Sequence, residues 1–436
     1  MLPAEFQPPA ADPQGERHVR EAARERLRRL LDENPGRGSA VPAQVAEPAR
    51  SIVKEEIDNY NRAAVMVNSP RLPESEALVR WVVDAILYYG PLTPALRDAH
   101  TEEVFCDGPH RISVVRGGRH VLTTLAFEDD AHLLATIKKL ATDAGRRIDE
   151  SSPMVEARLP DGARLHAVIP PIARPWPYVT IRRFPARPLR LSELSDEDSG
   201  NAVLTEQAAA FLVTALRGGA NVLIVGGTGS GKTTLLNGLL AELGGPGQRT
   251  VVIEETAELQ IQDIPFAVAL EGRPPNIEGA GEVGLRPLVK AALRMRPRRI
   301  VVGEARGPEA FDLLQAMNTG HEGSLATAHA NSPRDGLERL VTMAAQAGER
   351  LPDATLRRMV AQAIGLVIHM ELDAHGRRRV TEIWELTGME GDQFQGHAVF
   401  QVQGAALRPT GLPSRWHGAA QAVVNGRVYE SADAVV

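Results

Sequence analysis

A glycine-rich stretch, VGGTGSGKTTLL at Val225–Leu236, contains the pattern G-x-x-x-x-G-K-T. It follows the apolar run NVLIV, and the residues after the lysine have helical spacing. In this strand–loop–helix context the pattern binds nucleotide phosphates, because backbone N–H groups turn inward and glycines leave room for the phosphate. The N-terminus of the helix beyond the loop also favours an anion. The predicted phosphate-binding residues are Gly226, Gly227, Thr228, Gly229, Ser230, Gly231, Lys232, Thr233 and Thr234.

Two side chains of this loop have expected roles of their own. Lys232 is placed to reach the β- and γ-phosphates, and the hydroxyl of Thr233 is placed to bind Mg²⁺. The sequence has no N-K-x-D motif that would recognise a guanine base. The expected cofactors are therefore ATP and Mg²⁺.

Hydrolysis also requires a carboxylate that positions the attacking water near the metal. The stretch RIVVGEAR reads as an apolar strand ending in Glu304, and TVVIEETAE as another strand ending in Glu254 and Glu255. Because the carboxyl ends of parallel strands form the ligand crevice, all three glutamates are candidates, and the sequence does not choose the base among them. Gly303 stands where many phosphate-loop enzymes have an aspartate, so contact of Glu304 with Mg²⁺ is expected through water.

A polar segment, TGHEGSLATAHANSPRD, contains His321 and His329. This spacing is not that of a zinc site, and with one cysteine in the chain we reject a structural metal site here. One interpretation is that the two histidines are ordinary polar residues. The other is that they sense the γ-phosphate, by donating to an oxygen that is lost on hydrolysis.

The composition limits the classes of protein that fit. Apolar residues make up 43% and charged residues 24%, as in a soluble globular protein, and no apolar run approaches the ~20 residues that cross a bilayer. The N-terminus does not resemble a secretory signal, and the single cysteine, Cys106, excludes an internal disulfide and fits a reducing cytoplasm. A net charge of −6 argues against nucleic acid as a partner.

The periodicity predicts an α/β protein in several parts. Strands and helices alternate after residue 205, which is typical of a parallel sheet covered by helices on both faces. Within the N-terminal part, Arg20–Asn34 reads as a solvated helix or flexible arm and Gly36–Pro48 as a linker. The expected parts are an arm (1–48), a helical segment (49–89), a small α/β domain (76–184, overlapping that helix), a linker (185–204) and an ATPase domain with a C-terminal subdomain (205–436).

Taken together, these features resemble the CpaF-type (tight-adherence, Flp pilus) branch of the type II/type IV secretion ATPase superfamily. The resemblance runs from about Gly90 to Asp392 and includes RRIDESSPMVEARLPDGARLHAVIPP, RPPNIEGAGEV, ALRMRPRRIVVGEARGPEAFDLLQAMNTGHEGSLATAHANSPRDGLERL and RRRVTEIWELTGMEGD. Three positions depart from the family pattern, because Glu255, Arg298 and Gly365 stand where aspartates are common. The change at Glu255 concerns how the attacking water is positioned, and the changes at Arg298 and Gly365 concern the surface or the packing.

The resemblance implies a RecA-like C-terminal domain and a hexameric ring. It also implies a Walker A loop at Gly226–Thr233, an Asp box at Glu254–Leu259, a Walker B motif at Ile300–Glu304 and a His box at His321–His329. By position, Arg164 and Arg182 match family arginines that reach the phosphates from the N-terminal domain. Further family arginines match Arg273, Arg294 and Arg296, for which a subunit interface or surface ion pairs are the alternatives.

The leading hypothesis is an ATP-hydrolysing motor, cytoplasmic and peripheral to the inner face of the plasma membrane, that drives type IV (Flp/Tad-type) pilus assembly or secretion. Its expected partners are copies of itself and an inner-membrane platform protein, with membrane contact through that protein and no direct nucleic-acid contact. The alternatives are a nucleic-acid-translocating RecA-like ATPase, a GTPase switch and a catalytically inactive ring.

Overall fold

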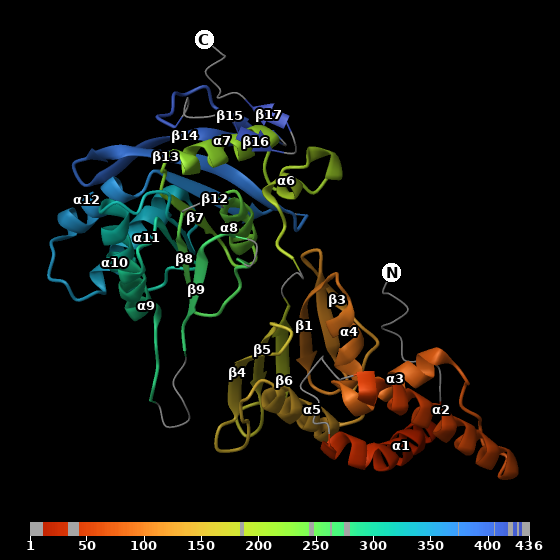
Figure 1. Ribbon diagram of the computed structural model, residues 1–436. Helices are drawn as coiled ribbons and strands as arrows, with labels where there is room; N and C mark the ends of the chain where they lie inside the picture. Colours follow the sequence, from red (N-terminus) through yellow and green to blue (C-terminus); the bar gives the residue numbers. More distant parts are fainter. Residues whose placement is uncertain are drawn as a thin grey trace. The chain divides into compact units, whose positions relative to one another are not determined.

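The computed structural model describes residues 12–33, 43–183, 187–243, 248–261, 264–273, 280–373, 375–404, 406–416, 422–424 and 427–429. The chain divides into two compact units, Met1–Ala186 and Arg187–Val436, which are described separately below (Figure 1).

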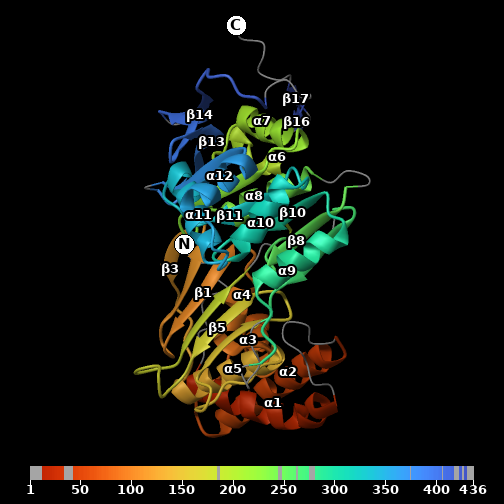
Figure 2. The ribbon, with the colours of Figure 1, turned by 90° about the vertical axis from the view of Figure 1, so that its left-hand side faces the viewer.

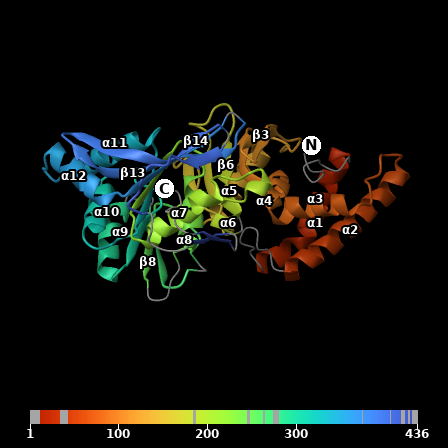
Figure 3. The same ribbon diagram turned by 90° about the horizontal axis from the view of Figure 1, so that it is seen from above.

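The first unit begins with three helices that share an apolar core. They are α1 (Pro13–Glu33), α2 (Ala43–Met66) and α3 (Glu76–Leu87), and they lie side by side in Figures 1 and 3. One face of α1, with Val19, Ala23 and Leu27, is buried in this core. The sequence predicted a solvated helix or flexible arm here, because a stripe of three apolar residues does not reveal its partner. Helix α2 also begins inside the segment that the sequence predicted as a linker.

A six-stranded antiparallel sheet completes the first unit, in the order β3-β2-β1-β6-β5-β4. Helix α5 packs against it through Leu133, Ile137 and Leu140, which contribute to one buried core with residues of the strands. Gly162 has φ +91° in the β4–β5 turn, a conformation that glycine adopts without strain. The elements are α4 (Thr93–Arg97), β1 (Thr101–Asp107), β2 (Ile112–Arg116), β3 (Arg119–Leu122), α5 (Asp130–Asp143), β4 (Met154–Arg158), β5 (Arg164–Val168) and β6 (Tyr178–Arg182).

The second unit is built on a nine-stranded sheet in the order β15-β14-β13-β12-β7-β11-β10-β8-β9. The six strands from β12 to β9 in this order are parallel, and β13, β14 and β15 extend the sheet antiparallel. A separate pair, β16 (Ala422–Val424) and β17 (Arg427–Tyr429), follows. The sheet strands are β7 (Val222–Gly226), β8 (Thr250–Glu254), β9 (Ala267–Glu271), β10 (Arg299–Val302), β11 (Leu325–Ala328), β12 (Leu366–Leu372), β13 (Arg378–Glu390), β14 (Gln393–Gln403) and β15 (Ala406–Pro409).

Helices cover both faces of this sheet. Along β7, Val222 and Ile224 enter one apolar core and Leu223 and Val225 the other, as expected for a strand that is buried on both sides. Helices α6 (Leu191–Leu194), α7 (Glu206–Arg217) and α8 (Lys232–Ala241) cover the first face. The second face carries α9 (Leu285–Ala292), α10 (Glu309–Asn318), α11 (Pro333–Ala345) and α12 (Asp353–Ala363), seen from the front in Figure 2.

This architecture confirms the predicted fold class, an α/β protein with an N-terminal helical extension, a small α/β domain and a RecA-like phosphate-loop domain. The side chain of Thr205 caps α7 by accepting from the N–H of Ala208, as its position before the helix predicted. In the part of the chain that the structure describes, no helix has the length and apolar character needed to span a bilayer.

Candidate active site

The phosphate loop connects β7 to α8 in the strand–loop–helix arrangement that the sequence predicted. Gly226 has φ +158°, and a Cβ at this position would lie 2.3 Å from the carbonyl oxygen of Met370 on the neighbouring strand β12. Gly229 and Gly231 adopt φ +74° and +96°. Gly226 is required because a side chain would collide with β12, and Gly229 and Gly231 are required because their positive φ angles disfavour other residues.

Lys232, the first residue of α8, bends back over its own loop. Its Nζ donates hydrogen bonds to the carbonyl oxygens of Gly226 (3.0 Å) and Gly227 (2.8 Å), and the side chain of Ser230 donates to the same oxygen of Gly227 (2.9 Å). Thr233 follows in the first turn of the helix and is half-buried. The loop thus holds a buried cation beside its own backbone, where a polyphosphate would be bound.

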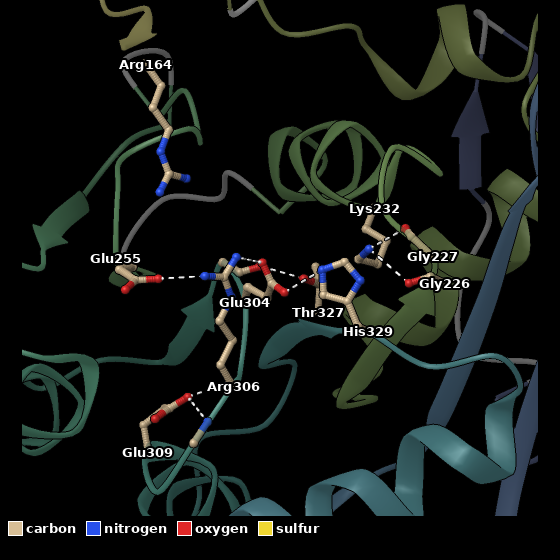
Figure 4. Close-up of polar contacts among 12 residues, drawn as sticks. Arg164, Gly226, Gly227, Lys232, Glu255, Glu304, Arg306, Glu309, Thr327 and His329 are labelled. Atoms are coloured by element: carbon tan, nitrogen blue, oxygen red, sulfur yellow. Dashed lines mark hydrogen bonds and ion pairs between the residues drawn. The ribbon is translucent and has the colours of Figure 1, made fainter. Parts of the chain in front are cut away.

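Glu304 follows β10, two strands away from β7, and lies between two basic side chains (Figure 4). Arg306 Nη2 donates to Glu304 Oε2 at 2.7 Å, and His329 Nε2 lies 2.8 Å from Glu304 Oε1. His329 directly follows β11, the strand between β10 and β7. The parallel order of the sheet therefore brings Glu304 and His329 to the edge that carries the phosphate loop.

The electrostatics of this group favour an anionic carboxylate beside a neutral imidazole. Burial raises the pKa of Glu304, but Arg306, His329 and Lys232 outweigh this effect and leave the pKa below its ordinary value. For His329, burial and then Lys232 lower the pKa, and Glu304 opposes them only in part. At neutral pH a charged acceptor and a neutral imidazole thus face the same site.

Arg306 is a candidate site residue that the sequence reasoning missed. Besides Glu304 it contacts Glu255, whose Oε2 accepts from Arg306 Nη1 at 2.9 Å (Figure 4). Glu255 itself is largely exposed, with 61% of its side chain accessible. The available signal was the spacing of Glu304 and Arg306, because alternate residues of an extended segment point to the same side.

Glu254, the third carboxylate candidate, is in a different environment. It is 4% exposed, and its Oε1 accepts from the N–H groups of Glu258 and Leu259, both at 3.0 Å. Burial raises the pKa of Glu254 to about 7, against the lowering effect of these two hydrogen bonds. The structure therefore separates the three glutamates into one in contact with Arg306 and His329, one on the exposed side of Arg306, and one bound to backbone.

His321 is not brought to this group within the chain. It precedes β11, and its Nδ1 lies 3.0 Å from the carbonyl oxygen of Ala316 near the end of α10. Because β11 and β7 are parallel, with Leu325 beside Val222 and Ala328 beside Val225, His321 lies at the edge of the sheet opposite the phosphate loop. The strand thus separates the two histidines that the sequence reasoning treated as a pair.

The two arginines predicted to reach the phosphates belong to the first unit and are cross-strand neighbours. Arg164 on β5 pairs with Arg182 on β6, and Arg158 on β4 continues the same row. A carboxylate lies near each of them, Glu156 at 3.7 Å from Arg164 and Glu103 at 3.8 Å from Arg182. Like charges on adjacent strands repel each other, and Glu103 on β1, the cross-strand partner of Arg182, ends this basic row.

Among the other arginines, Arg378 is a second residue that the sequence reasoning missed. It begins β13, and its Nε donates to the carbonyl oxygen of Gly229 in the phosphate loop at 3.0 Å. The basic run Arg377–Arg379, directly followed by the apolar-rich residues VTEIWEL, was the available signal. Arg294 and Arg296 are exposed in the turn that precedes β10, at the opposite edge of the sheet from the phosphate loop.

The structure accounts for two of the departures from the family pattern. A Cβ at position 365 would lie 2.9 Å from Cζ2 of Trp416, so Gly365 leaves room for the C-terminal segment. Arg298 lies 3.4 Å from Glu322 in an exposed ion pair, a surface role as expected.

Within the described residues no group of three or more His, Cys, Asp or Glu side chains is arranged to hold a metal ion. An anionic carboxylate at Glu304 and a hydroxyl at Thr233, both on the edge of the sheet that carries the loop, fit a Mg²⁺ that is shared with phosphate oxygens.

Removal of the Arg306 guanidinium is expected to move the acid limb of the pH–rate profile. In Arg306→Ala the half-buried Glu304 loses its strongest pKa-lowering partner, so ATP turnover is expected to fall away at a higher pH than in the wild type. The measurement is kcat against pH, with Arg298→Ala as the control. An unchanged acid limb in Arg306→Ala would show that Arg306 does not control the ionisation of Glu304.

Comparisons with known proteins identify the family to which this chain belongs. The family model for type II/IV secretion system proteins matches residues 88–410. The conjugal transfer protein TrbB of Rhizobium radiobacter is 32% identical over 315 residues, covering 72% of this chain and 92% of TrbB. The type IV secretion system protein PtlH of Bordetella pertussis is 37% identical over 282 residues, covering 60% of this chain and 82% of PtlH.

Solved structures are similar over a comparable length. The VirB11 ATPase of the Brucella suis type IV secretion system is 30% identical, with a TM-score of 0.37, and the match covers 68% of this chain and 92% of VirB11. The ATPase DotB of Legionella pneumophila is 24% identical, with a TM-score of 0.47, and the match covers 67% of this chain and 79% of DotB.

Proposed function

Because the chain belongs to the type II/IV secretion system protein family, we propose that it is an ATPase that powers a membrane-associated secretion or pilus machine. The observation that carries this proposal is the position of Glu304 and His329 at the sheet edge of the phosphate loop, with Lys232 acting electrostatically on both. A hydrolytic site needs this combination of phosphate cradle, cation and water-positioning carboxylate.

In the proposed reaction, the loop and Lys232 bind the β- and γ-phosphates of ATP. The neutral His329 has one N–H, on the Nε2 that lies 2.8 Å from Glu304 Oε1, and when ATP is bound this N–H would donate to the γ-phosphate instead of to Glu304. Glu304, anionic at neutral pH, then positions the attacking water and accepts its proton. Bound Mg²⁺ would neutralise charge that develops on the phosphate oxygens, with Thr233 and Glu304 as its protein neighbours. ADP and phosphate are released, and the loss of the γ-phosphate removes the partner of His329.

The finer assignment that we propose is a hexameric motor of the Flp/Tad pilus type at the cytoplasmic face of the membrane. It is supported by the resemblance of the sequence motifs, whereas the relatives, which are named as secretion and conjugal transfer proteins, support only the broader class of machine. The proposed partners are other copies of this chain and an inner-membrane platform protein. Light scattering of the purified protein with and without nucleotide tests the ring, and a particle mass that does not reach six copies contradicts it.

The direct test of the activity is phosphate release from ATP with Mg²⁺ by the purified full chain, with GTP as the competing substrate. We expect turnover of ATP and no advantage for GTP. The sequence-based alternative, a nucleic-acid-translocating ATPase, predicts instead that DNA stimulates turnover with a steep dependence on salt. Stimulation of this kind would favour the alternative over the pilus or secretion motor.

Arg164 and Arg182 are proposed to contact the phosphates during turnover. Because each arginine would stabilise charge on the transferring group, Arg164→Ala and Arg182→Ala are each expected to lower kcat by about 10² or more. Arg182→Lys keeps the charge but loses the planar fork, so it should recover activity only in part. Arg119→Ala on the exposed strand β3 is the control, and a wild-type kcat in both alanine variants would contradict the proposed contact.

A further inference from the structure

Glu254 lies at the end of β8, where a carboxylate could either accept a proton from the attacking water or hold a backbone loop in place. Its Oε1 accepts two backbone N–H groups, those of Glu258 and Leu259, and its Oε2 is 3.3 Å from the N–H of Leu259. A carboxylate that accepts several backbone N–H groups caps a loop. The segment it holds is Glu255–Leu259, called the 255–259 loop below.

Gly303, at the end of the neighbouring strand β10, provides the space for this carboxylate. A Cβ at position 303 would lie 2.8 Å from Cγ and 3.2 Å from Oε1 of Glu254. The N–H of Gly303 donates to the carbonyl oxygen of Ile253 at 2.9 Å, which joins the two strand ends directly. Gly303 is not among the glycines with positive φ, so what it contributes is space.

The first residue of the 255–259 loop, Glu255, connects this loop to Glu304 through Arg306. Glu255 contacts Arg306 (2.9 Å), and Arg306 contacts Glu304 (2.7 Å). A change in the loop would therefore move Glu255 and release one arm of Arg306. The pKa of Glu254 does not separate the two roles, since a value near 7 suits a general base as well as a buried structural acid.

We propose that Glu254 is a positioning residue, which holds the 255–259 loop in the space left by Gly303 and thereby orients Arg306 toward Glu304. This inference rests on the proposed ATPase function and assigns the base role to Glu304 alone. It also gives a reason for the glycine at position 303, where an aspartate would displace Glu254.

The glutamine variants separate a hydrogen-bond acceptor from a base. Glu254→Gln keeps a carbonyl oxygen for the two N–H groups, so its kcat is expected to stay within about threefold of the wild type, whereas Glu304→Gln is expected to lose about 10²–10⁴. Glu254→Ala is expected to lose about tenfold or more in kcat with a smaller change in KM. If Glu254→Gln is as inactive as Glu304→Gln while the wild type hydrolyses ATP, the positioning role is overturned.

A double-mutant cycle tests the contact itself. Gly303→Ala is expected to reproduce the defect of Glu254→Ala, and the double variant should be no worse than either single variant, because both disrupt one contact. Gly284→Ala is the control, since a Cβ there meets nothing within 4 Å. Full wild-type activity in Gly303→Ala would overturn the proposal.

The same three variants can also be compared by their thermal unfolding temperatures, a readout that does not require ATP turnover. Non-additive shifts of Tm are expected for the pair, and additive shifts would overturn the contact even for a protein that proved inactive. Failure of the wild type to hydrolyse ATP would instead contradict the proposed function, so the two failures are distinguishable.

Discussion

Lys232→Ala is expected to abolish ATP turnover. The Nζ group is the buried cation of the phosphate loop, 7% exposed as a residue, and it donates to the carbonyl oxygens of Gly226 and Gly227. Its loss removes a charge that would stabilise the transferring phosphoryl group, a change that costs about 10²–10³ in kcat at comparable sites. It also removes one of the charges that lower the pKa of both Glu304 and His329.

The measurement is steady-state phosphate release together with nucleotide affinity. Lys290→Ala is a matched control, because this lysine is half-exposed on α9 and 3.7 Å from Asp312, within the same unit. Both variants should unfold at temperatures close to the wild type. Turnover in Lys232→Ala at the level of Lys290→Ala would contradict the assignment of the phosphate loop as the reaction site.

Glu304→Gln is expected to stop hydrolysis and to leave ATP binding intact. The amide keeps the size of the side chain, but it cannot accept a proton from the attacking water, and a lost general base costs about 10²–10⁴ in rate. Since the pKa of Glu304 is lowered, its active, ionised form persists as pH falls below the ordinary range of a glutamate and is lost only when the pH passes through that lowered pKa. Wild-type turnover should therefore hold at mildly acidic pH.

Single-turnover kinetics and an ATP-binding assay separate the two effects. Glu322→Gln is the control, because Glu322 is exposed and its ion pair with Arg298 lies at the opposite edge of the sheet. A Glu304→Gln variant that binds ATP but does not release phosphate is the expected result. A variant that retains wild-type turnover would transfer the base role to one of the other two glutamates.

Much of the second unit follows from local sequence. The run from Asn221 to Leu236 specifies a buried strand, a glycine loop and a helix, because apolar spacing and glycine positions act over a few residues. Local patterns placed Glu304 and Glu255 after strands for the same reason. The burial of α1 did not follow, because its apolar stripe acquires meaning only from α2 and α3, which lie further along the chain.

By itself, the sequence predicted a phosphate loop between a buried strand and a helix, and it predicted which strands lead to carboxylates. The tertiary structure decided how those groups divide their roles. Strand order places His329, and not His321, beside Glu304, and the junction of β8 with β10 directs Glu254 to backbone N–H groups. Arg306 acquires its two carboxylate partners there as well. The physical reason is that periodicity and loop chemistry are properties of neighbours in sequence, whereas the partner of a side chain depends on which strands become neighbours in space.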